Sequence, residues 1–351
     1  MKKLVLFLIL LIPIKVMGIS ASSYAVMDAS SGRILVGSNI NDKKLIASTT
    51  KIMTAIIALE NGDINKEVVV DNDVLKAYGS AVYIEIGEKI KLIDLLYGLL
   101  LRSGNDAAIE IANNVAGSMD NFVQLMNNKA IDLGMKNTNF VNDNGLEEKT
   151  GENISTSYDM ALLMRYALGN DTFKKIIGTK EYVVKTNYKT YEWHNKDRLL
   201  TEYKYTIGGK TGYTEKAKRT LVTAAKKDNK TLIVVTLNDP NDFDDHKYLY
   251  ETCFSKYNLI KLLDKNNLKI PDYNQKGYID NDYNILLTPE EEKNIKINYE
   301  IKKDIVDDNI GKASITLNNK VIDEIPIYNS KRINNSEPWY QKLWDFLIFW
   351  K

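Results

Sequence analysis

The sequence predicts an α+β fold in which an antiparallel sheet is covered by helices, followed by a small β-rich domain at the C-terminal end. Strand-like runs lie at residues 23–38 and again at 220–237, with helical patterns between them. Strands from both ends of a region, with helices inserted between them, indicate a sheet that the helices cover. After about residue 260 the chain turns polar and then alternates in short strand-like segments. A chain of 351 residues is long enough for two such domains.

The composition excludes several classes of function. Lys and Arg number 47 against 46 Asp and Glu, so the net charge of +1 gives no global field that would attract nucleic acid. A single cysteine cannot form an internal disulfide, and we expect Cys253 to be a buried small hydrophobe on a helix face. The two histidines, His194 and His246, offer little material for a Ser-His-Asp triad or a multi-histidine metal site. We expect no metal and no organic cofactor.

The first twenty residues have the layout of a secretory signal peptide. A charged start, Met1-Lys2-Lys3, precedes an unbroken apolar run over residues 4–14, which is too short to span a bilayer comfortably. Small residues follow at Gly18, Ser20 and Ala21, so we expect cleavage near Gly18 or Ser20. The alternative is an uncleaved anchor or a buried core helix. The prediction is an exported protein with a signal peptide at residues 1–20.

The first domain, predicted over residues 21–260, begins with a hairpin. Residues 23–28 and 34–38 are predicted strands around the turn Ser30-Ser31-Gly32. Residues 51–59 are apolar on nearly every side and end at Asn61-Gly62, which indicates a helix buried on all faces. Further helices are predicted at 92–102, 106–115, 119–133 and 156–168. A second hairpin is predicted from strands 220–225 and 231–237 with a polar turn at 226–230.

The remaining chain predicts a small β domain and a terminal helix. Residues 261–335 contain strand-like segments at 284–287, 295–299, 311–317 and 321–328, with Asn318-Asn319 as a hairpin turn. Residues 336–351 form an amphipathic pattern rich in tryptophan, too short to cross a hydrocarbon core of roughly 30 Å. We expect this helix to lie in the membrane interface. The alternative is that it packs on its own protein or on a partner.

The motif Ser48-Thr49-Thr50-Lys51 begins the buried helix. Ser and Lys three residues apart at a helix start lie on the same face. A serine hydroxyl needs a neighbouring base to act as a nucleophile, and a lysine amine can be that base if burial lowers its pKa. The apolar helix behind Lys51 supplies that burial. On its own this motif is weak, because a serine is also a common helix N-cap.

Two further motifs strengthen the interpretation of Ser48 and Lys51 as a reactive pair. Ser103-Gly104-Asn105 lies between two predicted helices, where its side chains could project into a cleft or only punctuate the turn. Lys210-Thr211-Gly212 precedes the late hairpin and is predicted to lie on an edge strand. Lys210 and Thr211 suit a substrate carboxylate, and Gly212 allows a substrate backbone to approach closely. The surrounding glycines do not form a phosphate loop, because the required spacing is absent.

The order and spacing of the three motifs match those of penicillin-binding proteins and class A β-lactamases. With its flanking residues, from Ala47 to Thr54, from Leu101 to Ala108 and from Gly209 to Thr214, the chain resembles the low-molecular-mass D-alanyl-D-alanine carboxypeptidases. This resemblance extends over essentially the whole chain. It implies a β-lactamase/transpeptidase-like fold for the first domain and an enzyme that trims the terminal D-alanine from peptidoglycan stem pentapeptides. It also implies that β-lactams bind, and that the enzyme works at the outer face of the cytoplasmic membrane or in the cell wall.

The resemblance also implies a role for each site residue. Ser48 would be the acylated nucleophile, Lys51 its general base, and Ser103 a proton relay to the leaving amine. Asn105 would hold the substrate amide. The terminal carboxylate would bind to Lys210 and Thr211, beside Gly212. Backbone N–H groups of Ser48 and Tyr213 would form the oxyanion hole.

The chain departs from the family pattern at two places. Asn144 stands where family members often carry a histidine. Some members use an arginine after the late hairpin to bind the carboxylate, but residues 238–246 contain none. Arg219 and His246 are candidates to replace it. We expect the acidic run within 238–246 to be a solvated loop.

Three other functions remain open from sequence. A β-lactamase would need a carboxylate-activated water; Glu147, Glu148 and Glu152 lie in the relevant interval but without the usual motif. A D,D-endopeptidase acting on cross-links would use the same residues. A non-catalytic wall-binding scaffold would have a degenerate site, whereas all motif positions here are intact.

Overall fold

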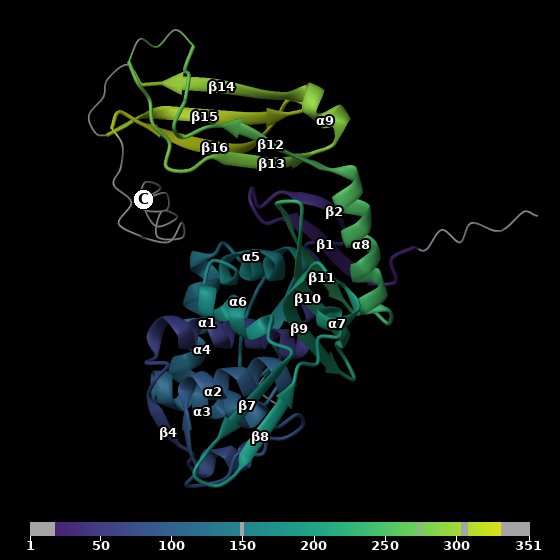
Figure 1. Ribbon diagram of the computed structural model, residues 1–351, viewed down its shortest axis with the longest axis vertical. Coiled ribbons are helices and arrows are strands. Elements are labelled where there is room, and N and C mark those ends of the chain that lie inside the picture. The colour runs from purple at the N-terminus through teal and green to yellow at the C-terminus, as the bar shows by residue number, and fades with distance from the viewer. Residues whose placement is uncertain (1–17, 148–150, 272, 274, 303–307, 331–351) are drawn as a thin grey trace, which may run out of the picture.

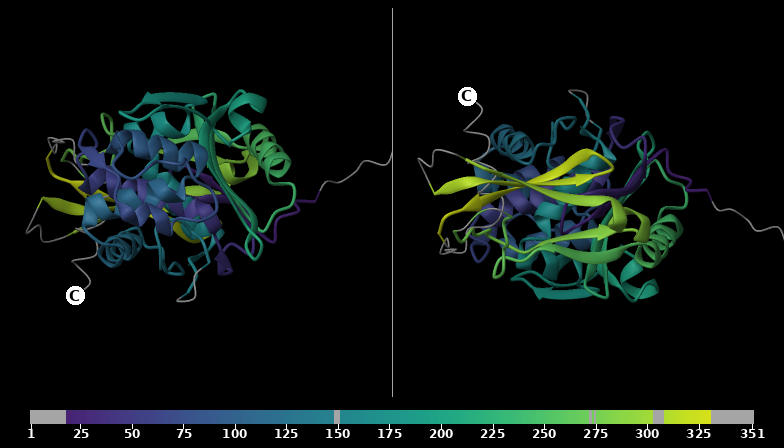
Figure 2. Two further views of the ribbon diagram at one scale, coloured as in Figure 1. Left: turned by 90° about the horizontal axis from the view of Figure 1, so that it is seen from below. Right: turned by 90° about the horizontal axis from the view of Figure 1, so that it is seen from above.

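The computed structural model describes residues 18–147, 151–271, 273, 275–302 and 308–330 (Figure 1). A sheet covered by helices forms the larger part of the molecule. Strands β12 to β16, which lie between Asn258 and Tyr328, form a separate β-rich layer at one end of it (Figures 1 and 2). The predicted fold class is therefore confirmed.

The central sheet is antiparallel and has five strands in the order β2-β1-β11-β10-β9. Its strands are β1 (Ser23–Asp28), β2 (Ile34–Ser38), β9 (Thr206–Thr214), β10 (Lys218–Lys227) and β11 (Lys230–Leu237). The first predicted hairpin has the predicted bounds. The late hairpin turns at Asp228-Asn229, both with positive φ, as a tight two-residue turn requires. The first strand of the domain, β1, therefore pairs with its late strand β11.

Helices pack on both faces of this sheet. Side chains alternate along β11, so that Ile233 and Val235 join one core and Leu232 and Val234 join the other. The larger core contains the helices α1 (Lys51–Asn61), α2 (Leu92–Tyr97), α3 (Asn105–Ala116), α4 (Met119–Asp132), α5 (Ser157–Ala167) and α6 (Asp171–Ile177). The opposite face is covered by α7 (Leu199–Glu202) and α8 (Asp242–Lys256). The prediction of a helix buried on all faces is confirmed, because every residue of α1 from Lys51 to Ala58 is buried.

Several short elements connect these layers. A 3₁₀ turn, η1 (Ala47–Thr50), leads directly into α1, and a π-helical turn, Gly98–Arg102, follows α2. A second 3₁₀ turn is η2 (Asn72–Lys76). Three small two-stranded ladders pair β3 (Lys44–Leu45) with β6 (Ile154–Ser155), β4 (Glu67–Val69) with β5 (Lys89–Lys91), and β7 (Glu181–Lys185) with β8 (Thr190–His194).

The acidic stretch 238–246 is not the solvated loop that the sequence predicted. Helix α8 begins inside it at Asp242, and Asp242 and Asp245 are buried in its first turn. Negative charge is favoured there by the helix dipole, and Asp242 also forms an ion pair with Arg219 at 2.9 Å. Cys253 lies on the same helix and is buried, as predicted.

The C-terminal domain has its own hydrophobic core. Its elements are β12 (Asn258–Leu263), β13 (Tyr283–Leu287), α9 (Pro289–Asn294), β14 (Ile295–Ile301), β15 (Asn309–Leu317) and β16 (Lys320–Tyr328). The predicted turn is present, since Asn318 and Asn319 both have positive φ between β15 and β16. The sequence missed the short helix α9, which Thr288 and Glu291 begin with a capping box. The predicted boundary after residue 260 falls inside β12.

Polar contacts join the two domains at the β1–β2 turn. Arg33 donates through Nη1 to the Leu286 carbonyl at 2.8 Å and pairs with Glu291. Asp28 accepts a hydrogen bond from Leu286 N at 3.1 Å. The β domain therefore sits against the turn between β1 and β2, whereas β9 forms the far edge of the sheet.

The predicted signal peptide, apart from residues 18–20, and the predicted C-terminal helix at 336–351 lie outside the described residues. Among the described residues, no helix combines the length and the apolar character needed to cross a bilayer.

Candidate active site

The first motif puts an amine beside a hydroxyl, one turn apart. Ser48 lies in η1 and Lys51 begins α1, so their side chains share one face. Lys51 Nζ is 3.2 Å from Ser48 Oγ, and 2.7 Å from both Asn105 Oδ1 and the Asn144 carbonyl oxygen. A neutral amine has two N–H groups and one lone pair. With the N–H groups donated to the two nearer oxygens, the lone pair faces the Ser48 hydroxyl.

Burial favours the neutral form of this amine. Lys51 is completely buried among the apolar residues of α1. Removal from water disfavours the ammonium form and lowers the pKa of Lys51 to about 7, although the charge of Asp143 opposes the shift. A large fraction of the amine is therefore neutral near pH 7, as the sequence reasoning required.

The second motif turns the chain between two helical segments. Ser103 ends the π-helical turn in the left-handed conformation at φ 64°, and Asn105 is the first residue of α3. Asn105 Nδ2 donates to the Tyr78 carbonyl at 2.5 Å while Asn105 Oδ1 accepts from Lys51. The amide is therefore fixed between two elements. Sequence reasoning left open whether Ser103 only punctuates a turn, and the structure brings its hydroxyl to the site.

The third motif lies on the edge strand β9, as predicted. Lys210 is buried, and its Nζ donates to Ser103 Oγ at 3.1 Å and to the Thr211 carbonyl at 2.6 Å. Burial lowers the pKa of Lys210 well below its usual range, and the charges of Lys51 and Lys196 lower it further. An arriving anion would reverse this effect and favour the ammonium form.

Gly212 allows strand β9 to approach Ser48 closely. A Cβ at this position would lie 3.0 Å from Ser48 N, 3.1 Å from Thr49 N and 2.4 Å from Thr220 Oγ1. Because no side chain larger than hydrogen fits, β9 can pass directly against η1. The next residue, Tyr213, is 60% exposed and lies at the mouth of the site.

These residues surround one cavity of about 390 Å³. Ser48, Ser103, Thr211, Gly212 and Tyr213 line it, while Lys51, Asn105 and Lys210 are buried behind its wall. The structure therefore brings together all eight predicted site residues. A larger cavity of about 670 Å³ is lined in part by Tyr78 and Asn144, but none of the eight predicted site residues lines it.

Two arginines lie at the cavity rim, and only one of them, Arg219, was a candidate from sequence. Arg198 and Arg219 both line the cavity and lie over the Phe243 ring, with their guanidinium carbons 4.6 Å and 5.6 Å from its centroid. Arg219 also forms its ion pair with Asp242. Arg219 was one of two candidates for a substituted carboxylate-binding cation, but Arg198 carried no sequence signal. Lys196 lines the same cavity.

His246, the other candidate, does not reach the cavity. Its ring is completely buried on α8 and contacts Thr223 through Nδ1 at 2.7 Å and Thr236 through Nε2 at 3.2 Å. Burial lowers the pKa of His246 to about 3, so its ring is neutral. It cannot supply a cation for a substrate.

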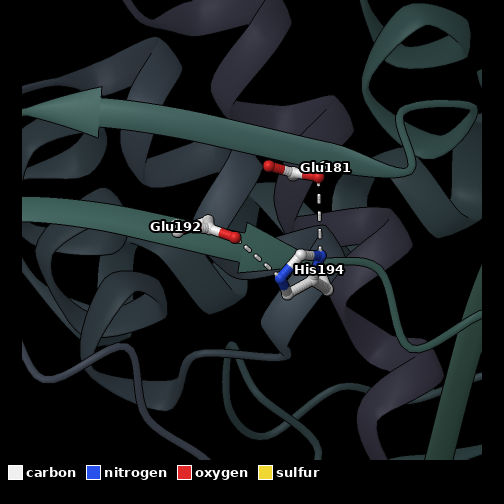
Figure 3. A group of neighbouring side chains, drawn as sticks. All are labelled: Glu181, Glu192 and His194. Atoms are coloured by element: carbon white, nitrogen blue, oxygen red, sulfur yellow. Dashed lines mark ion pairs between the residues drawn. The ribbon is translucent and has the colours of Figure 1, made fainter.

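One cluster among the described residues has the composition of a metal site. Glu181, Glu192 and His194 lie together on the β7–β8 hairpin (Figure 3). All three are exposed, and the histidine nitrogens already face the carboxylates, with Nε2 3.1 Å from Glu192 and Nδ1 3.8 Å from Glu181. Glu181 faces His194 across the two strands, whereas Glu192 lies two residues before it on β8. Such surface contacts are ordinary in a two-stranded ladder, and none of the three residues lines the cavity of Ser48.

A comparison of the sequence with protein families decides the assignment. A family model for D-alanyl-D-alanine carboxypeptidase matches residues 13–241. The chain belongs to this family. The D-alanyl-D-alanine carboxypeptidase DacF of Bacillus subtilis is 36% identical over 221 residues, which make up 61% of this chain and 56% of the relative. DacB2 of Mycobacterium tuberculosis is 35% identical over 217 residues, 62% of this chain and 74% of that protein.

Solved carboxypeptidase-family structures share the fold. Penicillin binding protein 5 from Haemophilus influenzae superimposes with a TM-score of 0.77 at 25% identity, covering 90% of this chain and 98% of that structure. A mutant of the Streptomyces K15 DD-transpeptidase gives a TM-score of 0.65 at 30% identity, covering 68% of this chain and 99% of that structure. The curated match to DacF spans little more than half of that relative's length.

Proposed function

We propose that this chain is a serine-type D-alanyl-D-alanine carboxypeptidase that removes the terminal D-alanine from peptidoglycan stem peptides through an acyl-enzyme on Ser48. One observation carries the proposal. The completely buried amine of Lys51 lies 3.2 Å from Ser48 Oγ, with its other contacts directed to oxygen acceptors. This is the arrangement that an activated serine needs in a chain without a usable histidine.

In the first step, Ser48 Oγ attacks the carbonyl carbon of the penultimate D-alanine while Lys51 takes the hydroxyl proton. The new oxyanion accepts hydrogen bonds from the backbone N–H groups of Ser48 and Tyr213. The close approach of β9 at Gly212 supports this pairing, because it brings the strand beside Ser48 N. Fixed donors of this kind contribute strongly to acyl transfer.

In the second step, the C–N bond breaks and the leaving amine takes a proton through Ser103. The contact between Ser103 Oγ and Lys210 Nζ supports this relay, since it links the hydroxyl to a second titratable amine. Lys210 and Thr211 bind the terminal carboxylate, and Asn105 holds the peptide amide. Water then hydrolyses the ester, which releases the shortened peptide and regenerates Ser48.

The structure gives no support for a β-lactamase. Glu147 accepts a hydrogen bond from Thr214 and pairs with Lys216 at 3.2 Å, and Glu152 pairs with Lys216 at 2.6 Å. Neither glutamate lines the cavity of Ser48. Both glutamates are therefore engaged elsewhere, and Glu148 lies outside the described residues. Asp242 is the one described carboxylate that lines the cavity, and it is paired with Arg219.

Product analysis separates the remaining functions. The purified chain should release free D-alanine from a stem pentapeptide, while a Ser48→Ala variant and a Lys51→Ala variant should release none. Cleavage of a cross-linked muropeptide dimer without D-alanine release would favour an endopeptidase. Rapid turnover of benzylpenicillin would favour a β-lactamase. Absence of all these activities would favour a non-catalytic wall-binding scaffold.

Export and membrane association form a second part of the proposal. The charged and apolar pattern of residues 1–20 supports secretion, and the tryptophan-rich pattern of 336–351 supports an interfacial anchor. The enzyme then acts at the outer face of the cytoplasmic membrane. Deleting residues 339–351 should release active enzyme from the membrane fraction; unchanged fractionation of this variant would contradict the anchor.

A further inference from the structure

Two buried carboxylates meet at the start of the described chain. Asp239 and Asp245 are 0% and 2% exposed, and both lie within hydrogen-bond distance of Ser20. Ser20 Oγ is 2.5 Å from Asp239 Oδ1 and 2.8 Å from Asp245 Oδ2, while Ser20 N donates to Asp245 Oδ2 at 2.6 Å. Segments more than two hundred positions apart in sequence therefore converge on one small polar site.

None of the described residues brings a positive charge to Asp239. A single hydroxyl proton of Ser20 cannot be donated to both carboxylates at once. Asp239 Oδ1 also accepts a hydrogen bond from Asn241 N at 3.1 Å, whereas no described residue lies within hydrogen-bonding geometry of the buried Asp239 Oδ2. Neither carboxylate forms an ion pair with another described residue. Burial raises the pKa of Asp239 to about 6, and the charge of Asp245 adds to the shift. Two buried carboxylates with an orphan oxygen are costly unless a cation or a bound proton neutralises one of them.

The chain itself offers one cation at this place. Ile19 packs against the apolar core between the sheet and α8, and Ser22 N donates to the Asn238 carbonyl at 3.0 Å. The segment from Ile19 to Ser22 is therefore docked beside the two carboxylates. If the chain began at Ile19, its α-ammonium group would lie one residue, about 3.8 Å of chain, before Ser20.

We propose that signal cleavage occurs between Gly18 and Ile19, and that the new α-ammonium group of Ile19 binds the Asp239–Asp245 carboxylate pair. Cleavage hydrolyses the Gly18–Ile19 peptide bond with one water, which leaves a carboxylate on the signal peptide and the amine on Ile19. Gly18 is a small residue of the kind that precedes such cleavage sites. Cleavage after Ser20 would remove the residue that contacts both carboxylates. Processing thus completes the fold of the catalytic domain by adding the missing charge.

The first test is the position of cleavage. The full-length chain is expressed in a bacterium that exports it, and the N-terminus of the mature protein is read by sequencing or intact mass. We expect Ile19 as the first residue. A mature chain that begins at Ala21 or later, or one that retains the signal, overturns the proposal.

The second test isolates the charge. Chain 19–351 is released from a fusion by a protease that leaves Ile19 free, and a matched chain carries Gly-Ser before Ile19, which moves the ammonium group away. We expect the midpoint of thermal unfolding to be at least about 2 °C higher for the chain that begins at Ile19. Equal midpoints overturn the proposal, whatever the cleavage site.

The third test assigns that difference to the carboxylates. Both chains are also made with Asp239→Asn and Asp245→Asn, substitutions that keep shape but remove charge. We expect the difference in midpoint to vanish in this background. In the unsubstituted chain, the Ile19 amine should also react more slowly with an acylating reagent than the amine of the extended chain. Equal reaction rates, or an undiminished difference in the substituted background, contradict an ion pair at this site.

Discussion

Replacing Asn105 with aspartate should move the pH dependence of acylation upward. Asn105 Oδ1 is 2.7 Å from Lys51 Nζ, so Asn105→Asp would put a carboxylate against the proposed general base. An opposite charge at such a distance favours the ammonium form and raises a lysine pKa by about 1–3 units. The pKa of Lys51 would then rise from about 7 toward the ordinary range.

The size of the effect follows from the fraction of neutral amine. With a pKa of about 7, half of Lys51 is neutral at pH 7, and acylation should fall as the pH drops through this value. At an ordinary lysine pKa of about 10.4, only about 0.04% would be neutral at pH 7. Burial of Lys51 is therefore responsible for roughly a 10³-fold gain in active base. An upward shift of 1–3 units would lower acylation at pH 7 by about 5- to 500-fold and restore much of it at high pH.

The assay measures the rate of labelling by a fluorescent penicillin between pH 5 and about 10. Asn105→Ala serves as the control, because it also removes the amide but adds no charge. Both variants should be labelled more slowly than the wild type, but only Asn105→Asp should shift the acidic limb of the pH–rate profile to higher pH. If the acidic limb of the pH–rate profile of Asn105→Asp stays at the wild-type pH, Lys51 is not the group that titrates in acylation.

Two further substitutions test the walls of the cavity. Gly212→Ala should slow acylation by about 10²-fold, because its Cβ would push β9 away from Ser48 N. Gly134→Ala is the control, because a Cβ there meets nothing within 4 Å. This variant should keep the acylation rate despite the positive φ of Gly134. Arg219→Ala should raise KM for D-alanyl-D-alanine peptides about tenfold by removing a rim cation, with kcat little changed, whereas Arg219→Lys should keep most of the affinity. Steady-state kinetics with unchanged KM for Arg219→Ala would remove this residue from the substrate site.

Short-range patterns predicted much of the fold. The hairpins around Ser30-Ser31-Gly32 and Asn318-Asn319 were predictable because turn residues with positive φ are chemically distinctive. Helix α1 was predictable because its residues are apolar in every direction. The start of α8 was not, because buried Asp242 and Asp245 look like surface residues until Arg219 and Ser20 are known to contact them.

The motif residues of the site were also predictable, but its rim was not. Ser48, Ser103 and Lys210 occur in motifs whose residue types fit one reaction. Arg198 has no such context, and it reaches the cavity only because α7 packs beside β9. The partners of Lys51 were likewise hidden, since the Asn144 carbonyl is a backbone group that no sequence pattern reveals.

The central claim is that Ser48 is the acylated residue and that Lys51 makes it reactive. The most direct measurement is the intact mass of the protein after exposure to benzylpenicillin, followed by peptide mapping of the adduct. We expect one penicilloyl group on the peptide that contains Ser48, and none in Ser48→Ala or Lys51→Ala. An adduct on another residue, or an undiminished adduct in either variant, would contradict the account.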